Sequence, residues 1–304
     1  MKAARARAAA AAPRPALRTR KGALYHGDCL ELLPELARST SERFDLVYVD
    51  PPFNAGGKRG ARIGRGERVR GQFAYTDAWG GLDAFLSMLE PRLGASAGVM
   101  SDRASLYLHL DHRAVHDAKV LADGVFGRER FQGEIVWVPG NGARRRSGPS
   151  VTHQTILVYS KTKSFIWNAD DAALREPYAD TSLRMHFSET DAEGRRFRER
   201  VIGDKRYCYY ADDGRRLGSV WTDCPAMRAN TPLVKETTGY PTQKPESLLE
   251  RIIRAASLTD SRVLDPMCGS GTTLAVAERL GRSWTGVDRS DLAIDVVKKR
   301  LRGR

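Results

Sequence analysis

Apolar and polar positions follow two patterns along the first half of the chain. Short runs rich in apolar residues predict strands at residues 23–26, 44–49, 104–110, 134–138 and 155–159. Longer amphipathic segments predict helices at residues 30–37, 82–93 and 112–125. The run at 44–49 is apolar at nearly every position, which is typical of a strand buried on both faces. Strands and helices in alternation indicate an α/β sheet with crossover helices.

From residue 168 to residue 240 this rhythm breaks down. Charged residues, aromatics and turn signals are mixed there, without long periodic elements, and we interpret the segment as an inserted module. The α/β pattern then returns, with helices predicted at 245–256, 272–280 and 292–301 and strands at 262–265 and 284–288. The sequence therefore predicts one α/β domain in two parts, 22–167 and 241–304, interrupted by a module at 168–240.

Composition narrows the class of protein. With 304 residues and a hydrophobic share of 41%, the chain can build one large core, or one core and a smaller module. It has no run of eighteen apolar residues, so we expect no membrane span. Its four cysteines are scattered without a Cys-x-x-Cys pair, which fits a reducing cytoplasm.

Positive charge is concentrated in two segments. The net charge is +13, and residues 1–21 carry seven basic residues and no acidic one, while residues 54–70 carry six basic residues against Glu67. We predict a disordered tail at 1–21 and a mobile basic loop at 54–77, without secondary structure. A polyanion is the natural partner, because Lys and Arg on mobile segments neutralise phosphates and release counterions. For the tail alone, a solubilising surface explains the charge equally well.

A glycine-rich turn follows the strand predicted at 262–265. Residues 265–273 read Asp-Pro-Met-Cys-Gly-Ser-Gly-Thr-Thr, the strand–turn–helix pattern that cradles nucleotides in doubly wound sheets. There is no Gly-x-x-x-x-Gly-Lys, so a triphosphate-binding loop is not indicated. Asp288 ends the next predicted strand, where an acid commonly binds ribose hydroxyls. The alternative is a plain turn in which an Asp caps the helix.

A second motif, Asp50-Pro51-Pro52-Phe53, ends the strand predicted at 44–49. The two prolines fix the backbone, so the Asp50 carboxylate and the Pro51 carbonyl form two acceptors on a rigid frame. An exocyclic amine has two N–H groups that suit such a pair, and Phe53 offers a stacking face to an extruded base. By itself, this segment is more typical of a turn that ends a strand.

Together, the two motifs resemble the amino-methyltransferases of DNA. Their order, with the catalytic motif first and the cofactor motif last, resembles the β class of that family. Tyr-Pro-Thr-Gln-Lys-Pro at 240–245 and Gly-Asp-Cys at 27–29 resemble two further family segments, so the likeness covers about residues 22–302. It implies an S-adenosylmethionine-dependent, Rossmann-like sheet in circularly permuted form, completed by the strand at 23–26. By its position in the chain, the module at 168–240 is the candidate for target recognition.

The resemblance also implies roles for single residues. Asp50, Pro51, Pro52 and Phe53 would bind and activate the target amine. In the cofactor S-adenosylmethionine, the adenine would contact Asp28 and the ribose Asp288. The complete predicted cofactor set is Asp28, Cys29, Lys244, Asp265, Pro266, Gly269, Ser270, Gly271, Thr272, Thr273 and Asp288. Met267 stands where the family often has Phe, and methionine can fill the same apolar space.

Duplex DNA is the predicted partner. The basic loop leaves the Asp-Pro-Pro-Phe turn directly, so we expect it to contact phosphates. The predicted DNA-binding residues are Lys58, Arg59, Arg62, Arg65, Arg68, Arg70, Arg144, Arg145 and Arg146. Candidates for sequence readout in the module are Arg195, Arg196, Arg198, Tyr207, Tyr209 and Trp221, although these aromatics equally fit a small core. A homodimer and a cognate restriction endonuclease are further partners that the family allows, at a cytoplasmic, nucleoid-associated location.

We predict methylation of the 6-amino group of adenine in duplex DNA, by base flipping and direct transfer. Asp50 favours adenine, whereas a Ser at that position favours cytosine, which is a tendency of the family. The alternatives are the 4-amino group of cytosine, an RNA or protein-glutamine methyltransferase, and an inactive DNA-binding relative.

Other chemistries find little support in the sequence. His109, His112 and His116 lack a His-Glu-x-x-His pattern, so we predict no metal site and place these histidines at caps or on the surface. Cys29 and Cys268 lack a cysteine-centred catalytic motif, which disfavours methylation of cytosine at C5.

Overall fold

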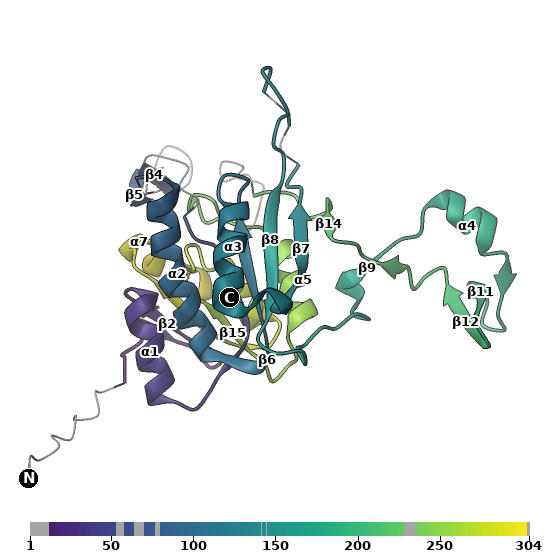
Figure 1. The fold of residues 1–304 in the computed structure, drawn as a ribbon, viewed down its shortest axis with the longest axis horizontal. Helices are drawn as coiled ribbons and strands as arrows, with labels where there is room; N and C mark the ends of the chain where they lie inside the picture. The colour runs from purple at the N-terminus through teal and green to yellow at the C-terminus, as the bar shows by residue number, and fades with distance from the viewer. Residues whose placement is uncertain are drawn as a thin grey trace, which may run out of the picture.

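A nine-stranded sheet forms the centre of the protein (Figure 1). The computed structural model describes residues 12–52, 58–63, 70–76, 80–140, 142–143, 145–227 and 236–302. The strand order is β1-β2-β16-β15-β3-β6-β8-β7-β14. In chain order these strands are β1 (Leu17–Arg18), β2 (Gly22–His26), β3 (Phe44–Val49), β6 (Met100–Leu110), β7 (Phe131–Trp137), β8 (Gln154–Ser160), β14 (Val220–Trp221), β15 (Arg262–Asp265) and β16 (Ser283–Asp288).

The centre of the sheet is parallel and permuted. Strands β2, β16, β15, β3 and β6 pair in parallel, and β8 runs antiparallel to both β6 and β7. The first strand of this parallel set, β2, lies beside the last, β16, with Gly22 opposite Trp284 and His26 opposite Asp288. The predicted α/β fold class, with its permuted strand at 23–26, is therefore confirmed.

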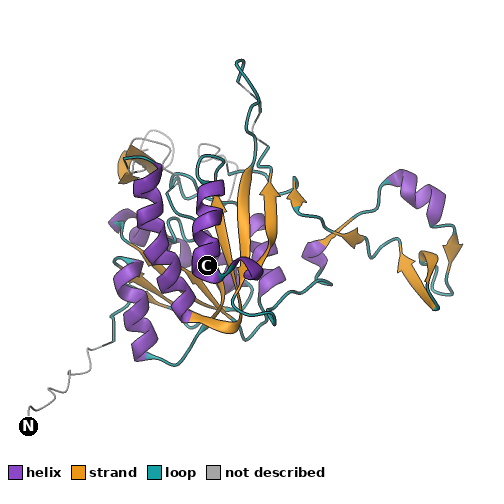
Figure 2. Ribbon diagram, viewed as in Figure 1, coloured by secondary structure: helices purple, strands orange, loops and turns teal. Residues whose placement is uncertain are grey.

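Helices cover both faces of the sheet (Figure 2). The helices on one face are α1 (Cys29–Ser39), α2 (Leu82–Val99) and α3 (Val115–Phe126), and those on the other are α5 (Glu246–Ala256), α6 (Thr272–Arg279) and α7 (Asp291–Arg302). Strand β3 is buried along its whole length, and its side chains alternate between two cores. Leu46 and Tyr48 pack with α5 and α6, whereas Val47 and Val49 pack with α1 and α2.

The predicted disorder of residues 1–21 is wrong where the structure describes this segment. Strand β1 pairs antiparallel with β2, with Leu17 opposite Leu24. The Thr19 hydroxyl donates to Glu278 of α6 at 2.9 Å, which ties the strand to the body. A two-residue strand made by backbone pairing leaves no apolar period in the sequence, so the pattern gave no sign of it.

The loop predicted at 54–77 also contains regular structure. Strands β4 (Lys58–Ile63) and β5 (Arg70–Thr76) pair antiparallel, so the prediction of a loop without secondary structure is wrong for these residues. The hairpin rests on α7, because Ser290 donates to the Ala74 carbonyl at 2.9 Å and Ala74 packs beside Ala293 and Val296. Backbone hydrogen bonds between strands need no alternation of apolar and polar residues. The Gly/Arg-rich sequence therefore gave no sign of the hairpin.

The inserted module extends away from the body beyond β14 (Figure 1). Its elements are a 3₁₀ helix (Ala172–Leu174), β9 (Arg175–Glu176), α4 (Asp180–His186), β10 (Glu189–Thr190), β11 (Arg196–Ile202), β12 (Lys205–Tyr210) and β13 (Arg215–Arg216). Strands β10, β11 and β12 form a small sheet, and β13 pairs with β9 at the neck of the module. The chain rejoins the main sheet at β14, which pairs with β7 and lies well before the predicted boundary at 240.

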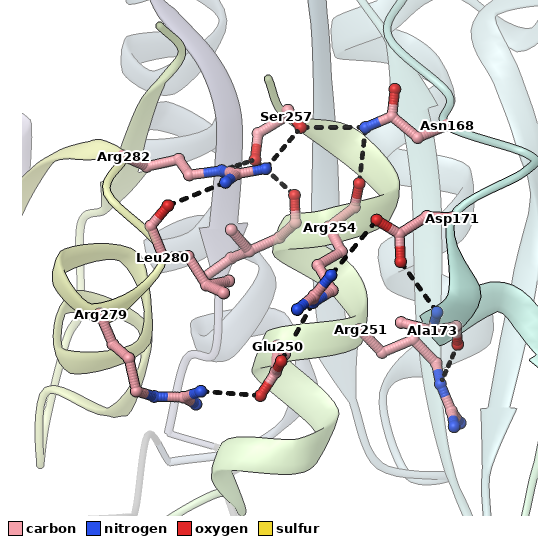
Figure 3. A network of polar contacts seen from close by, with 11 residues as sticks. Asn168, Asp171, Ala173, Glu250, Arg251, Arg254, Ser257, Arg279, Leu280 and Arg282 are labelled. Atoms are coloured by element: carbon pink, nitrogen blue, oxygen red, sulfur yellow. Dashed lines mark hydrogen bonds and ion pairs between the residues drawn. The ribbon is translucent and has the colours of Figure 1, made fainter. Parts of the chain in front are cut away.

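One arginine on α5 holds both ends of the module. Arg251 donates through Nε to the Ala173 carbonyl, where the module leaves the body (Figure 3). Through Nη2 it pairs with Asp223, just after the chain returns, at 2.5 Å. Trp221 lies beneath this guanidinium and is only 2% exposed. The prediction that Trp221 reads DNA is therefore wrong, because β14 places this side chain in the main core.

Asn168 and its neighbours fix the outgoing end of the module further (Figure 3). The Asn168 amide donates to the carbonyls of Arg254 and Ser257 at 2.6 and 2.9 Å, and thereby satisfies acceptors at the end of α5. The Arg254 guanidinium also lies 3.5 Å from Asp171. The base of the module is therefore fixed to α5, the helix that directly follows Pro245.

Gly271 tests how α6 packs on α7. It has φ +70, and a Cβ at this position would lie 2.6 Å from Val297. We expect Gly271→Ala to lower the free energy of unfolding by about 2–4 kcal/mol, from left-handed strain and overpacking together. Gly281→Ala is the matched control, because Gly281 has φ +78 with nothing within 4 Å of its added Cβ. Urea unfolding measures both variants, and equal losses would contradict the packing role.

Candidate active site

A cavity of about 480 Å³ opens at the carboxyl ends of the central parallel strands. Asp50 follows β3, Asp265 ends β15, Asp288 ends β16 and Asp28 follows β2, and all four line this cavity. This volume is typical of a small-molecule site. The edge of the sheet at which the cavity opens is the place where doubly wound folds bind their ligands.

The two sequence motifs meet because β15 and β3 are neighbours. Val263 pairs with Leu46 and Leu264 with Val47, so the two strands end side by side. The strands carry the 265–273 turn and the Asp-Pro-Pro turn, which lie more than 200 residues apart in sequence. Both turns line the same cavity.

Backbone amides shape the glycine turn around Asp288. Gly269 N–H donates to Asp288 Oδ2 and Ser290 N–H donates to Oδ1, each at 2.8 Å. Gly269 has φ +48, and an added Cβ would lie 3.3 Å from the Tyr240 ring. Burial raises the pKa of Asp288, although these amides favour its ionised form. The turn is therefore fixed in a conformation that suits glycine.

Asp28 is held from two sides at the edge of the cavity. It caps α1 by accepting from Leu30 N–H at 2.9 Å, and its other oxygen pairs with Arg92 at 2.5 Å. Arg289 lies 3.6 Å from the same oxygen. Arg92 comes from the middle of α2, and no motif in the sequence singled it out.

Lys244 lies against the Asp-Pro-Pro turn. Its ammonium pairs with Asp50 Oδ2 at 2.5 Å and contacts the Thr242 carbonyl at 3.5 Å. We predicted Lys244 as a cofactor residue, and it does line the cavity. Its charge, however, is directed at the predicted catalytic acid, a contact that spans 194 residues of sequence.

A buried polar chain lies beneath this ion pair. Tyr48 is hydrogen-bonded to His109 Nδ1 at 2.7 Å, and His109 Nε2 to the Gln154 amide oxygen at 2.7 Å. His109 is fully buried, so its predicted place at a cap or on the surface is wrong. Burial, and then the charge of Lys244, hold the pKa of His109 well below its ordinary value, so its ring is neutral. Among the described residues no cluster of His, Cys, Asp or Glu could hold a metal ion.

The cavity cysteines are protonated at neutral pH. Burial raises the pKa of Cys29 to about 11 and raises that of Cys268 well above its ordinary value. Only a thiolate is an effective nucleophile. The environment of both thiols therefore disfavours a covalent cysteine mechanism.

Most predicted site residues in the described part of the chain converge on this cavity. Its lining includes Asp50, Pro51 and Pro52, and also Asp28, Cys29, Lys244, Asp265, Pro266, Gly269, Ser270, Thr272, Thr273 and Asp288. Gly271 is not part of the lining, because it faces Val297 of α7. Phe53 lies outside the described residues. Other lining residues belong to no sequence motif and reach the cavity through tertiary packing: Tyr48, Phe73, Ala74, Met88, Arg92, Leu249, Arg289 and Ser290.

The predicted DNA-binding residues fall into three groups. Lys58, Arg59, Arg62 and Arg70 belong to β4 and β5, whereas Arg65, Arg68 and Arg144 lie outside the described residues. Arg145 and Arg146 are exposed on the connection from β7 to β8, which projects from the body (Figure 1). DNA contact by all of these residues stays a prediction.

Internal contacts occupy several of the readout candidates in the module. Arg195 pairs with Asp212 and Asp213, and Arg196 donates to the carbonyls of Leu183 and Phe187. Arg198 lies over the rings of Tyr178, Phe187 and Tyr209. Tyr207 is 41% exposed, and its role in readout stays a prediction.

Comparison with known families gives a match over most of the chain. The N6_N4_Mtase family, described as DNA methylase, matches residues 44–299. The type II methyltransferase M.EcaI of Enterobacter cloacae is 28% identical over 84% of this chain and 64% of its own length. M1.MboII of Moraxella bovis is 36% identical over 52% of this chain and 57% of its own length. This chain therefore spans less than two thirds of the length of each of these two relatives. The DNA adenine methyltransferase YhdJ of Escherichia coli is 28% identical over 91% of this chain and 82% of its own length.

Solved structures share the fold. The M1.HpyAVI–SAM complex has a TM-score of 0.56 and 18% identity, and covers 92% of this chain and 98% of that one. The cytosine-N4-specific PvuII DNA methyltransferase has a TM-score of 0.59 and 17% identity, and covers 95% of this chain and 89% of that one. At such identity the likeness concerns the fold alone. Within the described part of the chain, no helix combines the length and the apolar character that a membrane span requires.

Asp265 gives the site a pH signature. Burial raises its pKa to about 7, with Asp50 and Asp288 as further contributors. Between about pH 4 and pH 7 the native state holds a proton that the unfolded state releases, so this group costs stability as pH rises. The free energy of unfolding should therefore fall as the pH rises through this range. We expect Asp265→Asn to reduce that fall by up to about 1.4 kcal/mol per pH unit. Urea unfolding of both proteins across this range measures it, and parallel pH profiles would contradict the assignment.

Proposed function

Because this chain belongs to the N6_N4_Mtase family of DNA methylases, we propose that it transfers a methyl group from S-adenosylmethionine to an exocyclic amino group in duplex DNA. One observation carries the proposal. The Asp-Pro-Pro turn and the glycine turn line a single cavity at the carboxyl edge of the sheet, so an acceptor for an amine faces a cradle for a nucleoside-like cofactor.

The cavity residues fit S-adenosylmethionine. The cavity has a size that suits a cofactor of this class. Its lining supplies acidic side chains at four strand ends for a ligand with ribose hydroxyls and positive charge. We assign Asp288 to the ribose, Asp28 to the adenine, and Asp265, Gly269 and Thr272 to the methionine part. When bound, this cofactor supplies a methyl group already activated on a sulfonium. The protein therefore needs to position the amine rather than to provide a metal or a covalent nucleophile.

Asp50 and the Pro51 carbonyl perform that positioning in our proposal. Two acceptors on a rigid turn take the two N–H groups of the amine and direct its lone pair at the methyl group. The nitrogen–carbon bond forms as the carbon–sulfur bond breaks, with the electron pair going to sulfur. The excess proton then passes from the methylated nitrogen to solvent water. Because a base within a duplex cannot reach this cavity, the target must be flipped out, and Phe53 is predicted to stack on it.

We propose adenine as the target base. Asp50 supports adenine through the family tendency described above, and one relative across most of the chain is named a DNA adenine methyltransferase. Methylation of the 4-amino group of cytosine is the alternative outcome of the test. The homodimer and the cognate restriction endonuclease stay predictions.

Basic segments flank the edge of the sheet at which the cavity opens, which supports duplex DNA as the substrate. The basic hairpin β4–β5 adjoins the cavity through Phe73 and Ala74. The β7–β8 connection with Arg145 and Arg146 leaves the same edge of the sheet. Strand β8 runs antiparallel to both β6 and β7, so β7 ends at the same edge as the parallel strands β3 and β6. Positive charge on both sides of the opening suits phosphate contact while a base occupies the site.

Nucleoside analysis identifies the target. We expect unmethylated duplex DNA treated with the protein and S-adenosylmethionine to yield N6-methyl-2′-deoxyadenosine after digestion and mass spectrometry. If the product is 4-methylcytosine alone, the adenine proposal is wrong while amine methylation stands. RNA and a glutamine-containing peptide, offered in parallel, should remain unmethylated.

Asp50 separates catalysis from cofactor binding. We expect Asp50→Ala to abolish turnover, with a loss of at least about 1,000-fold, because an acceptor that orients the amine is gone. Calorimetry should still detect S-adenosylmethionine binding, since the glycine turn and Asp288 are intact. Turnover within tenfold of the unmodified protein would refute the role of Asp50.

A further inference from the structure

We propose that Lys244 is a positioning residue that keeps Asp50 ionised and oriented to accept the target amine. The inference rests on the proposed function and refines it. From the sequence, Lys244 was expected to serve the cofactor, whereas its ammonium lies 2.5 Å from Asp50 Oδ2. The question is therefore whether this lysine acts on the cofactor or through the acid.

The arrangement of charges in the cavity assigns Lys244 to Asp50. The lining as described contains three cationic residues, and the other two, Arg92 and Arg289, both lie against Asp28. The side chain of Lys244 is 7% exposed and that of Asp50 is 20% exposed. Removing two opposite charges from water is costly unless they remain paired. Each of these side chains thus fixes the position of the other.

The backbone two residues before Lys244 is strained. Thr242 has φ +57 and is the one non-glycine residue with positive φ among those the structure describes. A β-branched residue rarely adopts this conformation, which persists only where surrounding contacts enforce it. Those contacts are present, because Thr272 Oγ1 donates to the Lys244 carbonyl at 3.1 Å and the buried Gln243 amide accepts from Thr238. The strained turn presents Lys244 to the end of β3.

The groups that surround Asp50 make a compensating charge necessary. Tyr48 on β3 and Asp265 on β15 feel its negative charge, which raises the pKa of both side chains further beyond the effect of burial. Asp288 on β16 adds to the effect on Asp265, and His109 on β6 is neutral. Among the described residues of this cluster, Lys244 is the cation that pairs with Asp50. Without it, Asp50 would take up a proton more readily, since burial and a nearby carboxylate both favour the neutral acid.

Protonation of Asp50 would remove its function. A neutral carboxyl group donates one hydrogen bond and competes with the amine N–H groups that it should accept. The Lys244 charge prevents this and also weakens Asp50 as a base. Asp50 therefore orients the amine without taking its proton before the new bond has formed.

Three variants of Lys244 test the proposal. Lys244→Met removes the charge and the donor, Lys244→Gln keeps a donor without charge, and Lys244→Arg keeps the charge. Lys119→Met is the matched control, because Lys119 pairs with Asp123 at 2.6 Å outside the cavity lining. Each protein is assayed for single-turnover methylation of duplex DNA across pH at saturating S-adenosylmethionine, and for cofactor affinity by calorimetry.

We expect Lys244→Met to slow methyl transfer about 100-fold at neutral pH, with a cofactor Kd within about threefold of the unmodified protein. In Lys244→Met and in Lys244→Gln the acidic limb of the rate profile should move to higher pH. Lys244→Arg should recover at least about tenfold of the lost rate, and Lys119→Met should match the unmodified protein. Lys244→Gln retains a hydrogen bond, so its profile decides the matter even where Lys244→Met is too unstable to purify.

Two results would overturn the inference while leaving the proposed function intact. In the first, the unmodified protein methylates DNA, and Lys244→Gln has the same rate and the same acidic limb in its pH–rate profile. The second is a loss confined to cofactor affinity, which would return Lys244 to its role predicted from the sequence. Absence of methylation by the unmodified protein would instead refute the proposed function itself.

Discussion

The parallel pairing of β15 with β3 is the constraint on which the rest of the structure depends. It sets Val263 and Leu264 beside Leu46 and Val47, so that two turns far apart in sequence end at one edge. Both strands are buried on both faces, which fixes their register, because a shift by one residue would exchange the side chains of the two cores. This pairing forms the centre of the cavity. The neighbouring strands β16 and β2 add Asp288 and Asp28 to its lining.

The cost of the site is electrostatic. Asp28, Asp50, Asp265 and Asp288 lie around one cavity, and each is balanced differently. Asp28 pairs with Arg92 and Asp50 with Lys244, whereas Asp288 is held by backbone amides. Asp265 accepts from Met267 N–H, and burial raises its pKa to about 7. A cofactor that brings positive charge and hydroxyl groups would relieve much of this imbalance, so the same charges that lower stability prepare the site to bind a ligand.

The sequence predicted the parts of this arrangement that depend on local pattern. The strand at 44–49, the glycine turn after β15 and the permuted strand at 23–26 were all readable, because burial on both faces and tight turns restrict residue type. The hairpin of β4 and β5 was missed, because backbone pairing between Gly/Arg-rich segments has no apolar period. Trp221 was a candidate for DNA readout or for a small core of the module, whereas it is buried in the main core. A two-residue strand carries no signal of the sheet that it joins. The contact between Lys244 and Asp50 was not predictable, because only the folded sheet brings them together.

In the proposed reaction the methyl group passes in one step from the cofactor at the glycine turn to the amine at the Asp-Pro-Pro turn. The configuration of the transferred methyl group distinguishes one displacement from two. S-adenosylmethionine with a methyl group made chiral by hydrogen, deuterium and tritium is used to methylate duplex DNA, and the configuration of the transferred methyl group is determined. A single in-line transfer predicts inversion. Net retention would require a methylated protein intermediate and would contradict direct transfer.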